Sequence, residues 1–200
     1  MKRIFLALLL AISPFLSFAQ QKLSPEEKKL LERIDKNYQE TVALLEEVVN
    51  INSGSLNLEG VREVGRVFER EFQKIGFQTE WVDVPAGVKR AGHFVATRTG
   101  TKGKKLFLIG HLDTVFEKDM PFTPFTWLND STATGQGAND MKGGDVLVLA
   151  SLKALHELVR GRLFQCTGLP HLLWLFQRYN IQLHVERKAY SGLECSKHER

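Results

Sequence analysis

Residues 106–115 read LFLIGHLDTV, and this stretch decides how the rest of the chain is interpreted. Its first four residues form a continuous apolar run, which is typical of a central strand buried on both faces of a sheet. Gly110 ends the run, and His111 and Asp113 follow directly. Because ligands of open α/β sheets bind at the carboxyl ends of the strands, His111 stands where a binding site is expected.

The His-x-Asp spacing has a physical use at such a position. An imidazole that binds a metal through one nitrogen needs an acceptor on the other nitrogen, which fixes its tautomer and raises its basicity. Asp113, two residues after His111, is the candidate acceptor. On its own the pair also fits a strand-end histidine that is hydrogen-bonded only to the backbone, so the metal interpretation needs a second element.

A second motif follows downstream, where residues 135–144 read GQGANDMKGG. It places Asp140 in a glycine-rich turn before a helix, and glycine permits sharp turns and close backbone approach. A carboxylate such as Asp140 is able to bridge two metal ions about 3.5–4 Å apart in a two-metal hydrolytic site. A phosphate-binding helix start is the alternative, but the spacing of neither G-x-G-x-x-G nor the P-loop is present. The turn therefore favours a metal site.

The flanking sequence alternates between helical and strand patterns. Ser24, Pro25 and Glu27 form a capping box with proline at the first helical position, which predicts a helix start. Helices are expected over residues 24–50, 58–76 and 143–158, and strands over 77–84, 93–97 and 105–109, with a further short strand in 122–134. This succession predicts an α/β fold with helices packed on a mixed sheet.

Residues 1–19 are interpreted as a signal peptide, with two basic residues, a short apolar run and small residues before cleavage near Ala19. The run is shorter than the ~20 residues needed to span a bilayer, so no stable membrane span is expected. The protein should then be exported, to the periplasm or the cell exterior. Neither cysteine, Cys166 nor Cys195, lies in the first 158 residues, which suits an exported protein without a disulfide framework.

The sequence changes character near residue 159. The formal net charge is +4, and all of the basic excess lies in residues 159–200, so no basic nucleic-acid-binding face is expected. An apolar stretch at 169–176 has no partner pattern along the chain. We therefore divide the chain into a signal peptide (1–19), a main folded part (20–158) and an aberrant tail (159–200) that out-of-frame translation would explain.

Together, residues 110–115 and 140–144 resemble the zinc exopeptidase and deacylase family of glutamate carboxypeptidase, aminoacylase, acetylornithine deacetylase and succinyl-diaminopimelate desuccinylase. Residues 110–116 and Asn52-Ser53-Gly54-Ser55 are most similar to exported glutamate-carboxypeptidase-like members. The resemblance covers roughly residues 26–158 and rests on two separate motifs in the same order. The resemblance implies that residues 20–158 are the truncated N-terminal part of a mixed-sheet α/β zinc-peptidase catalytic domain with helices on both faces.

The resemblance implies a role for each residue of the half-site. His111 would bind one zinc ion, Asp140 would bridge two, and Asp113 would be the catalytic-site partner of His111. Cobalt or manganese could replace zinc. The implied reaction is hydrolysis of an amide bond next to a free carboxylate, in a peptide or an N-acyl amino acid. An intact member of the family would be a homodimer.

The sequence departs from the family after Asp140. The family needs an adjacent pair of glutamates at the end of a later strand, one as general base and one as zinc ligand, and no such pair follows here. We therefore expect an inactive truncated form. The alternative is a non-catalytic exported binding or interaction protein with at most one weak metal site. A related zinc aminopeptidase would place its bridging aspartate much closer to the His-x-Asp motif.

Overall fold

The computed structural model describes residues 23–85, 87–99, 106–160 and 171–176. In chain order the elements are α2 (Pro25–Lys36), α3 (Tyr38–Val49), α4 (Leu58–Lys74), β1 (Gln78–Val82), β2 (His93–Thr99), β3 (Leu106–Gly110), β4 (Thr126–Asn129), β5 (Thr132–Thr134), η2 (Ala138–Lys142), α5 (Gly143–Arg160) and β6 (His171–Phe176). Within these ranges, every helix is too short or too polar to cross a bilayer. The predicted signal peptide and both cysteines lie outside the described residues.

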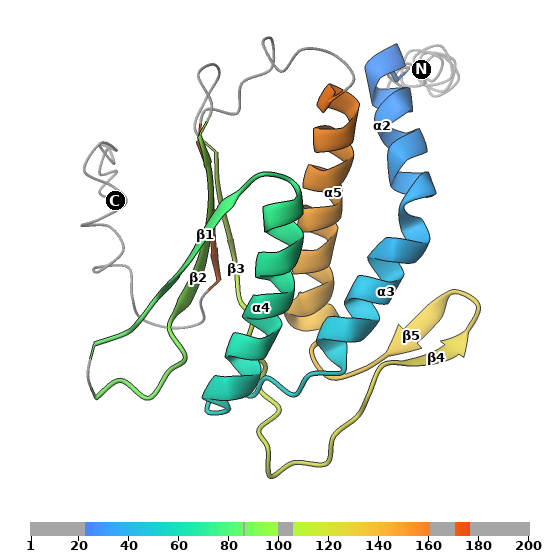
Figure 1. Cartoon of the computed structure of the whole chain (residues 1–200). Helices are drawn as coiled ribbons and strands as arrows, with labels where there is room; N and C mark the ends of the chain where they lie inside the picture. Colours follow the sequence, from blue (N-terminus) through green and yellow to red (C-terminus); the bar gives the residue numbers. More distant parts are fainter. Residues whose placement is uncertain (1–22, 86, 100–105, 161–170, 177–200) are drawn as a thin grey trace, which may run out of the picture.

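A mixed sheet of four strands, in the order β1-β2-β6-β3, lies to one side of the helices (Figure 1). Strand β2 runs antiparallel to both β1 and β6, whereas β3 and β6 are parallel. Strands β4 and β5 form a separate hairpin. The predicted α/β class with a mixed sheet is confirmed.

Strand β6 corrects the expectation that the apolar stretch at 169–176 has no partner. It lies between β2 and β3, where Leu175 is the register partner of both Val95 and Ile109. A continuous apolar run is what a strand hydrogen-bonded on both sides requires. Its partners lie far away in sequence, so the local pattern alone did not reveal them. Whether residues 159–200 are translated out of frame stays a prediction.

Strand β3 corrects a second expectation, because it is an edge strand of the described sheet and not a central one. Leu106 is 41 % exposed and Ile109 is 60 % exposed, so β3 is not buried on both faces. In the described part of the chain, the helices pack over one face of the sheet, and the predicted cover of the second face is not seen there (Figure 1). The central position is taken by β6.

The N-terminal helix begins as predicted but is divided in two. The Ser24 hydroxyl accepts a hydrogen bond from the Glu27 amide at 3.2 Å, and the Glu27 carboxylate accepts one from the Ser24 amide at 2.6 Å. Asn37, with φ −92° and ψ 6°, separates α2 from α3. Its side-chain amide donates to Glu157 on α5 at 3.0 Å, so a tertiary contact stabilises the break.

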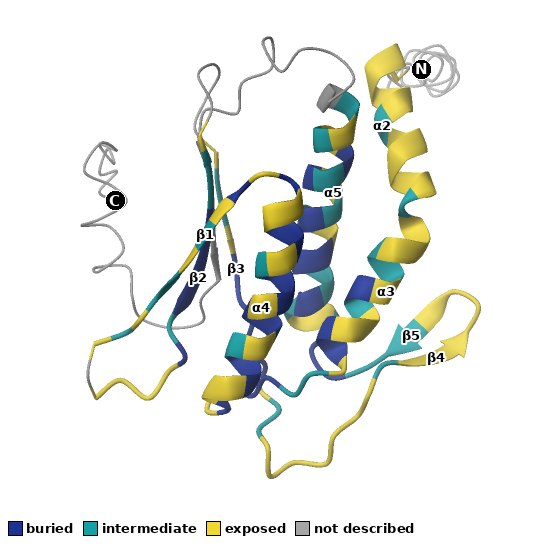
Figure 2. Ribbon diagram, viewed as in Figure 1, coloured by how far each residue is buried: buried dark blue, intermediate teal, exposed yellow. Residues whose placement is uncertain are grey.

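The core lies between the sheet, α4 and α5, as the dark inner faces of these helices show (Figure 2). Phe68 and Phe72 on α4 are fully buried, and the Phe72 ring packs edge-on against Phe77 with 5.1 Å between centroids. Helix α4 approaches β1 closely because Gly65 has no side chain: a Cβ there would lie 2.3 Å from the Trp81 ring. Close packing of this kind positions the loops that carry the site.

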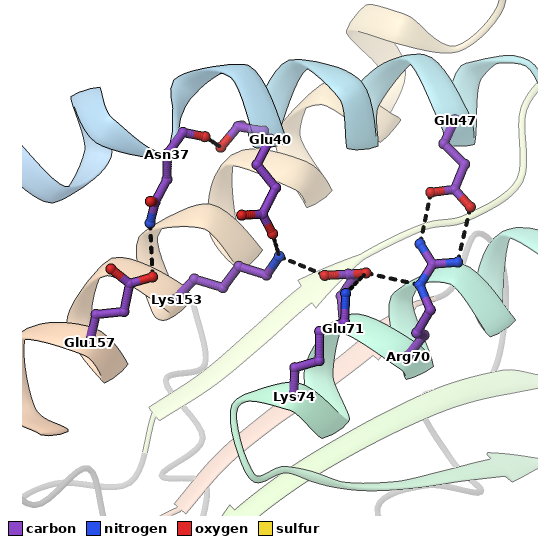
Figure 3. Close-up of polar contacts among 9 residues, drawn as sticks. Asn37, Glu40, Glu47, Arg70, Glu71, Lys74, Lys153 and Glu157 are labelled. Atoms are coloured by element: carbon purple, nitrogen blue, oxygen red, sulfur yellow. Dashed lines mark hydrogen bonds and ion pairs between the residues drawn. The ribbon is translucent and has the colours of Figure 1, made fainter.

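An ionic network around one buried carboxylate ties α3, α4 and α5 together (Figure 3). At its centre is Glu71 of α4, whose side chain is only 5 % exposed. Its carboxylate accepts hydrogen bonds from Lys153 at 2.6 Å, Lys74 at 2.8 Å and Arg70 at 2.9 Å. Lys153 also contacts Glu40 of α3 at 2.7 Å. Burial acts to raise the pKa of Glu71, but the three cations outweigh it and hold that pKa at about 2.

Candidate metal site

His111 leaves the end of β3 and is held by the turn that follows it. Its side chain is 11 % exposed. Nδ1 lies 2.9 Å from the main-chain oxygen of Asp113 and 3.4 Å from its carboxylate Oδ1. A carbonyl oxygen only accepts, so Nδ1 carries a proton and the lone pair of neutral His111 is on Nε2. The partner predicted for His111 thus contacts it through both its main chain and its side chain.

Asp140 reaches His111 from the second motif. Its carboxylate Oδ1 lies 2.9 Å from Nε2 of His111, and its side chain is 60 % exposed. The approach depends on Gly137, which has φ +76° and no room for a side chain: a Cβ there would lie 2.5 Å from Cγ2 of Thr114. The two motifs therefore meet as the sequence predicted, with His111, Asp113 and Asp140 in one cluster.

Lys142 anchors the Asp140 turn from behind, and sequence reasoning missed this role. It is 1 % exposed, and its ammonium donates to the main-chain oxygens of Val48 at 2.8 Å and Ile51 at 2.7 Å. These carbonyls lie at the C-terminal end of α3, where the helix dipole favours a cation. Burial lowers the pKa of Lys142 to about 8, although Asp145 acts against the shift. The ammonium thus stays charged at neutral pH.

Residues 52–57 anchor the His111 turn and were also missed. The Ser53 hydroxyl donates to the main-chain oxygen of Leu112 at 2.9 Å. The Ser55 hydroxyl donates to Oδ2 of Asp113. The sequence marked this segment as part of the family resemblance but did not reveal these hydrogen bonds, because their acceptors lie nearly sixty residues further along the chain.

Asp145, in the first turn of α5, is a buried carboxyl group close to the site. It is fully buried, and neither of its oxygens has a hydrogen-bond partner among the described residues. Burial raises its pKa to about 9, although Lys142 acts in the opposite direction. Asp145 is therefore a neutral acid at pH 7, which distinguishes it from the accessible carboxylate of Asp140.

The electrostatics of the cluster favour a positive centre between His111 and Asp140. Burial acts to lower the pKa of His111, but Asp113 and Asp140 outweigh it and raise that pKa above 6.5. A nitrogen lone pair and a carboxylate oxygen 2.9 Å apart repel unless a proton or a metal ion lies between them. An imidazole nitrogen and a carboxylate oxygen are both common zinc ligands, so the donor types fit a metal.

The number of ligands is smaller than a complete zinc centre needs. Structural zinc sites have four protein ligands and catalytic sites about three. Within the described ranges, no group of three or more histidine, cysteine, aspartate or glutamate side chains is placed to hold a metal. The cluster thus offers one oriented imidazole and one carboxylate as candidate metal ligands.

Comparison with known proteins finds similarity in sequence to one peptidase. No family model matches the chain. Over 117 residues it is 36 % identical to carboxypeptidase G2 of Pseudomonas sp. (strain RS-16), which covers 58 % of this chain and 28 % of that protein. The matched sequence is much longer than the two motifs that predicted the relationship.

Solved structures share the fold. Human carnosine dipeptidase 1 aligns with a TM-score of 0.60 and 20 % identity over 75 % of this chain and 34 % of its own. The M20 family metallo-carboxypeptidase Sso-CP2 of Sulfolobus solfataricus aligns with a TM-score of 0.51 and 19 % identity over 69 % of this chain and 30 % of its own. The chain spans about a third or less of each of these relatives. The chain is thus similar in sequence to carboxypeptidase G2 and shares its fold with solved peptidases, one of them an M20 family metallo-carboxypeptidase.

Proposed function

We propose that this chain carries one half of the metal centre of a zinc-dependent exopeptidase or amidohydrolase. In the intact enzyme, His111 and Asp140 bind metal and Asp113 orients His111. The proposal is carried by one observation, the convergence of His111 Nε2 and Asp140 Oδ1 at 2.9 Å while Asp113 holds the opposite ring nitrogen. Cobalt or manganese could occupy the same donors.

The chemistry divides between the metal and the protein. Bound zinc acts as a Lewis acid, which lowers the pKa of water to about 7 and polarises a carbonyl group. Asp113 keeps the Nδ1 proton of His111 in place, so that Nε2 presents its lone pair. Asp140, with two carboxylate oxygens, is suited to bridge two ions. We propose an amide bond next to a free carboxylate as the substrate, in keeping with the names of the carboxypeptidase relatives.

We also propose that the 200-residue chain does not turn over substrate by itself. No adjacent pair of glutamates follows Asp140 to supply a general base and a further ligand. General-base catalysis alone contributes about 10²–10⁴-fold to rate, and a missing ligand weakens metal binding as well. Out-of-frame translation of residues 159–200 would explain the loss. The coding DNA tests this, because one alternative frame should encode a strand that ends in adjacent acidic residues.

The alternative function is an exported binding protein that keeps the scaffold without catalysis. The observation that favours it is the incomplete ligand set in the described residues. Export through the predicted signal peptide would apply to both functions and is tested by mass spectrometry of the secreted chain, which should begin at Gln20.

Metal analysis separates these possibilities. We expect the full chain to bind at most one zinc ion by calorimetry, with affinity reduced at least tenfold in His111→Ala and Asp140→Asn. The matched controls are His156→Gln on α5 and Asp130→Asn in the β4–β5 turn, which should bind zinc as the unaltered chain does. Zinc binding that survives both site variants would refute the half-site. Zinc-dependent hydrolysis of an acyl-glutamate substrate would refute the proposed inactivity.

A further inference from the structure

We infer that Ser55 is a positioning residue for the metal site, acting on His111 through the carboxylate of Asp113; this inference rests on the proposed function. Ser55 lies in the turn before α4, outside both motifs. Its hydroxyl donates to Oδ2 of Asp113, while Oδ1 of the same carboxylate lies 3.4 Å from His111 Nδ1. One oxygen is held by the serine and the other is turned toward the imidazole.

The hydrogen bond from Ser55 matters because the Asp113 side chain does not fix the orientation of its carboxylate by itself. The terminal torsion of an aspartate side chain has a broad, roughly two-fold preference, so Asp113 needs an external partner to fix its plane. A serine hydroxyl supplies one donor, and a bond to an ionised carboxylate is stronger than a bond between neutral groups. The Thr114 main-chain oxygen is a second possible acceptor, but at 3.3 Å it is the more distant of the two.

Ser55 is itself held in place by the backbone. Its amide donates to the main-chain oxygen of Thr114 at 3.0 Å, and the Thr114 amide donates to the main-chain oxygen of Ser53 at 2.8 Å. These bonds form a parallel bridge between Gly54 and Thr114. The register of the bridge sets the serine beside Asp113.

Two serines in this segment have different tasks, which provides a control. Ser53 and Ser55 belong to one turn, and each donates one hydroxyl hydrogen bond to the loop after β3. Ser53 bonds the main chain of Leu112, whereas Ser55 bonds the Asp113 carboxylate. Loss of either hydroxyl should weaken the loop, but only the loss of Ser55 should release the carboxylate that orients His111.

The test compares zinc affinity and the visible spectrum of the cobalt-substituted protein in the full chain. We expect Ser55→Ala to weaken zinc binding about 10-fold or more, the range seen when partners of metal-binding histidines are removed. Ser55→Thr keeps the hydroxyl and should restore affinity to within about threefold of the unaltered chain. Ser53→Ala should leave affinity and spectrum nearly unchanged, although its resistance to urea falls.

The outcomes are distinguishable. If Ser55→Ala binds zinc as the unaltered chain does, or if Ser53→Ala loses as much affinity, Ser55 has only a structural role and the inference is wrong. In both cases the loss of binding in His111→Ala would leave the proposed function intact. If the unaltered chain shows no binding that depends on His111, the inference and the proposed function fail together.

Discussion

Replacing Glu71 by glutamine should destabilise the fold by about 3 kcal/mol at pH 7. The pKa of Glu71 is about 2 in the folded chain against 4.5 as its ordinary value, a difference of two to three units. Each unit corresponds to about 1.4 kcal/mol, which gives about 3 kcal/mol. Breaking a buried ion pair by removing one partner costs about 3–5 kcal/mol, and Lys153 would lose its buried partner and keep only the exposed Glu40. The two routes agree.

The pH dependence follows from the sign of the shift. The folded state favours ionised Glu71, so its stabilisation is complete above pH 4.5 and is lost as the pH falls toward 2. Glutamine does not titrate. The difference in unfolding free energy between the unaltered chain and Glu71→Gln should therefore be constant above pH 4.5 and shrink below it.

The assay is urea unfolding of the full chain, followed by far-ultraviolet circular dichroism at several pH values. Glu59→Gln is the matched control, since Glu59 lies on the same helix and pairs with Arg66, but both side chains are more than half exposed. Exposed pairs contribute little, so this variant should unfold like the unaltered chain. A loss below about 1 kcal/mol for Glu71→Gln at pH 7, or a difference that persists unchanged at low pH, would refute the reasoning.

Three further predictions concern the surroundings of the site. Lys142→Met should lower the free energy of unfolding in urea by about 2–3 kcal/mol and weaken zinc binding, because two main-chain carbonyls at the end of α3 lose their donor. If neither value changes, Lys142 does not hold the Asp140 turn. Asp145→Asn should stabilise the chain by on the order of 4 kcal/mol at pH 7, because folding raises the pKa of Asp145 from 3.8 to about 9. The unaltered chain loses stability as the pH rises through that interval, so the unfolding free energy of the variant should depend less on pH. Gly137→Ala should weaken zinc binding by calorimetry because its Cβ meets Thr114, whereas Gly76→Ala, also at positive φ but with open space around it, should not.

Several features were predictable because their causes are local. The capping box at Ser24 and Glu27 needs only four residues, and the structure has it. The alternation of helices and strands follows from apolar spacing within each segment. The meeting of His111 and Asp140 followed from the rule that ligands bind at strand ends, together with the glycine-rich turn. In each case the spacing of residues within a short segment was enough to predict the feature.

The remaining features depend on residues far apart in the chain. Strand β6 takes the central position that the apolar run of β3 was expected to hold, because pairing on both sides requires partners from β2 and β3. The break at Asn37 is supported by Glu157, which lies 120 residues away. A short window of sequence contains none of these partners, so local periodicity predicts the elements but not their order in the sheet.

The sequence by itself predicted which residues come together, His111, Asp113 and Asp140, and the chemistry that their side chains permit. Only the tertiary structure decided how they are held. Ser55 orients Asp113, which lies 58 residues away, and Lys142 binds the end of α3, which lies more than ninety residues away. A hydrogen bond depends on the distance between two atoms in space, and sequence spacing does not give that distance for residues so far apart.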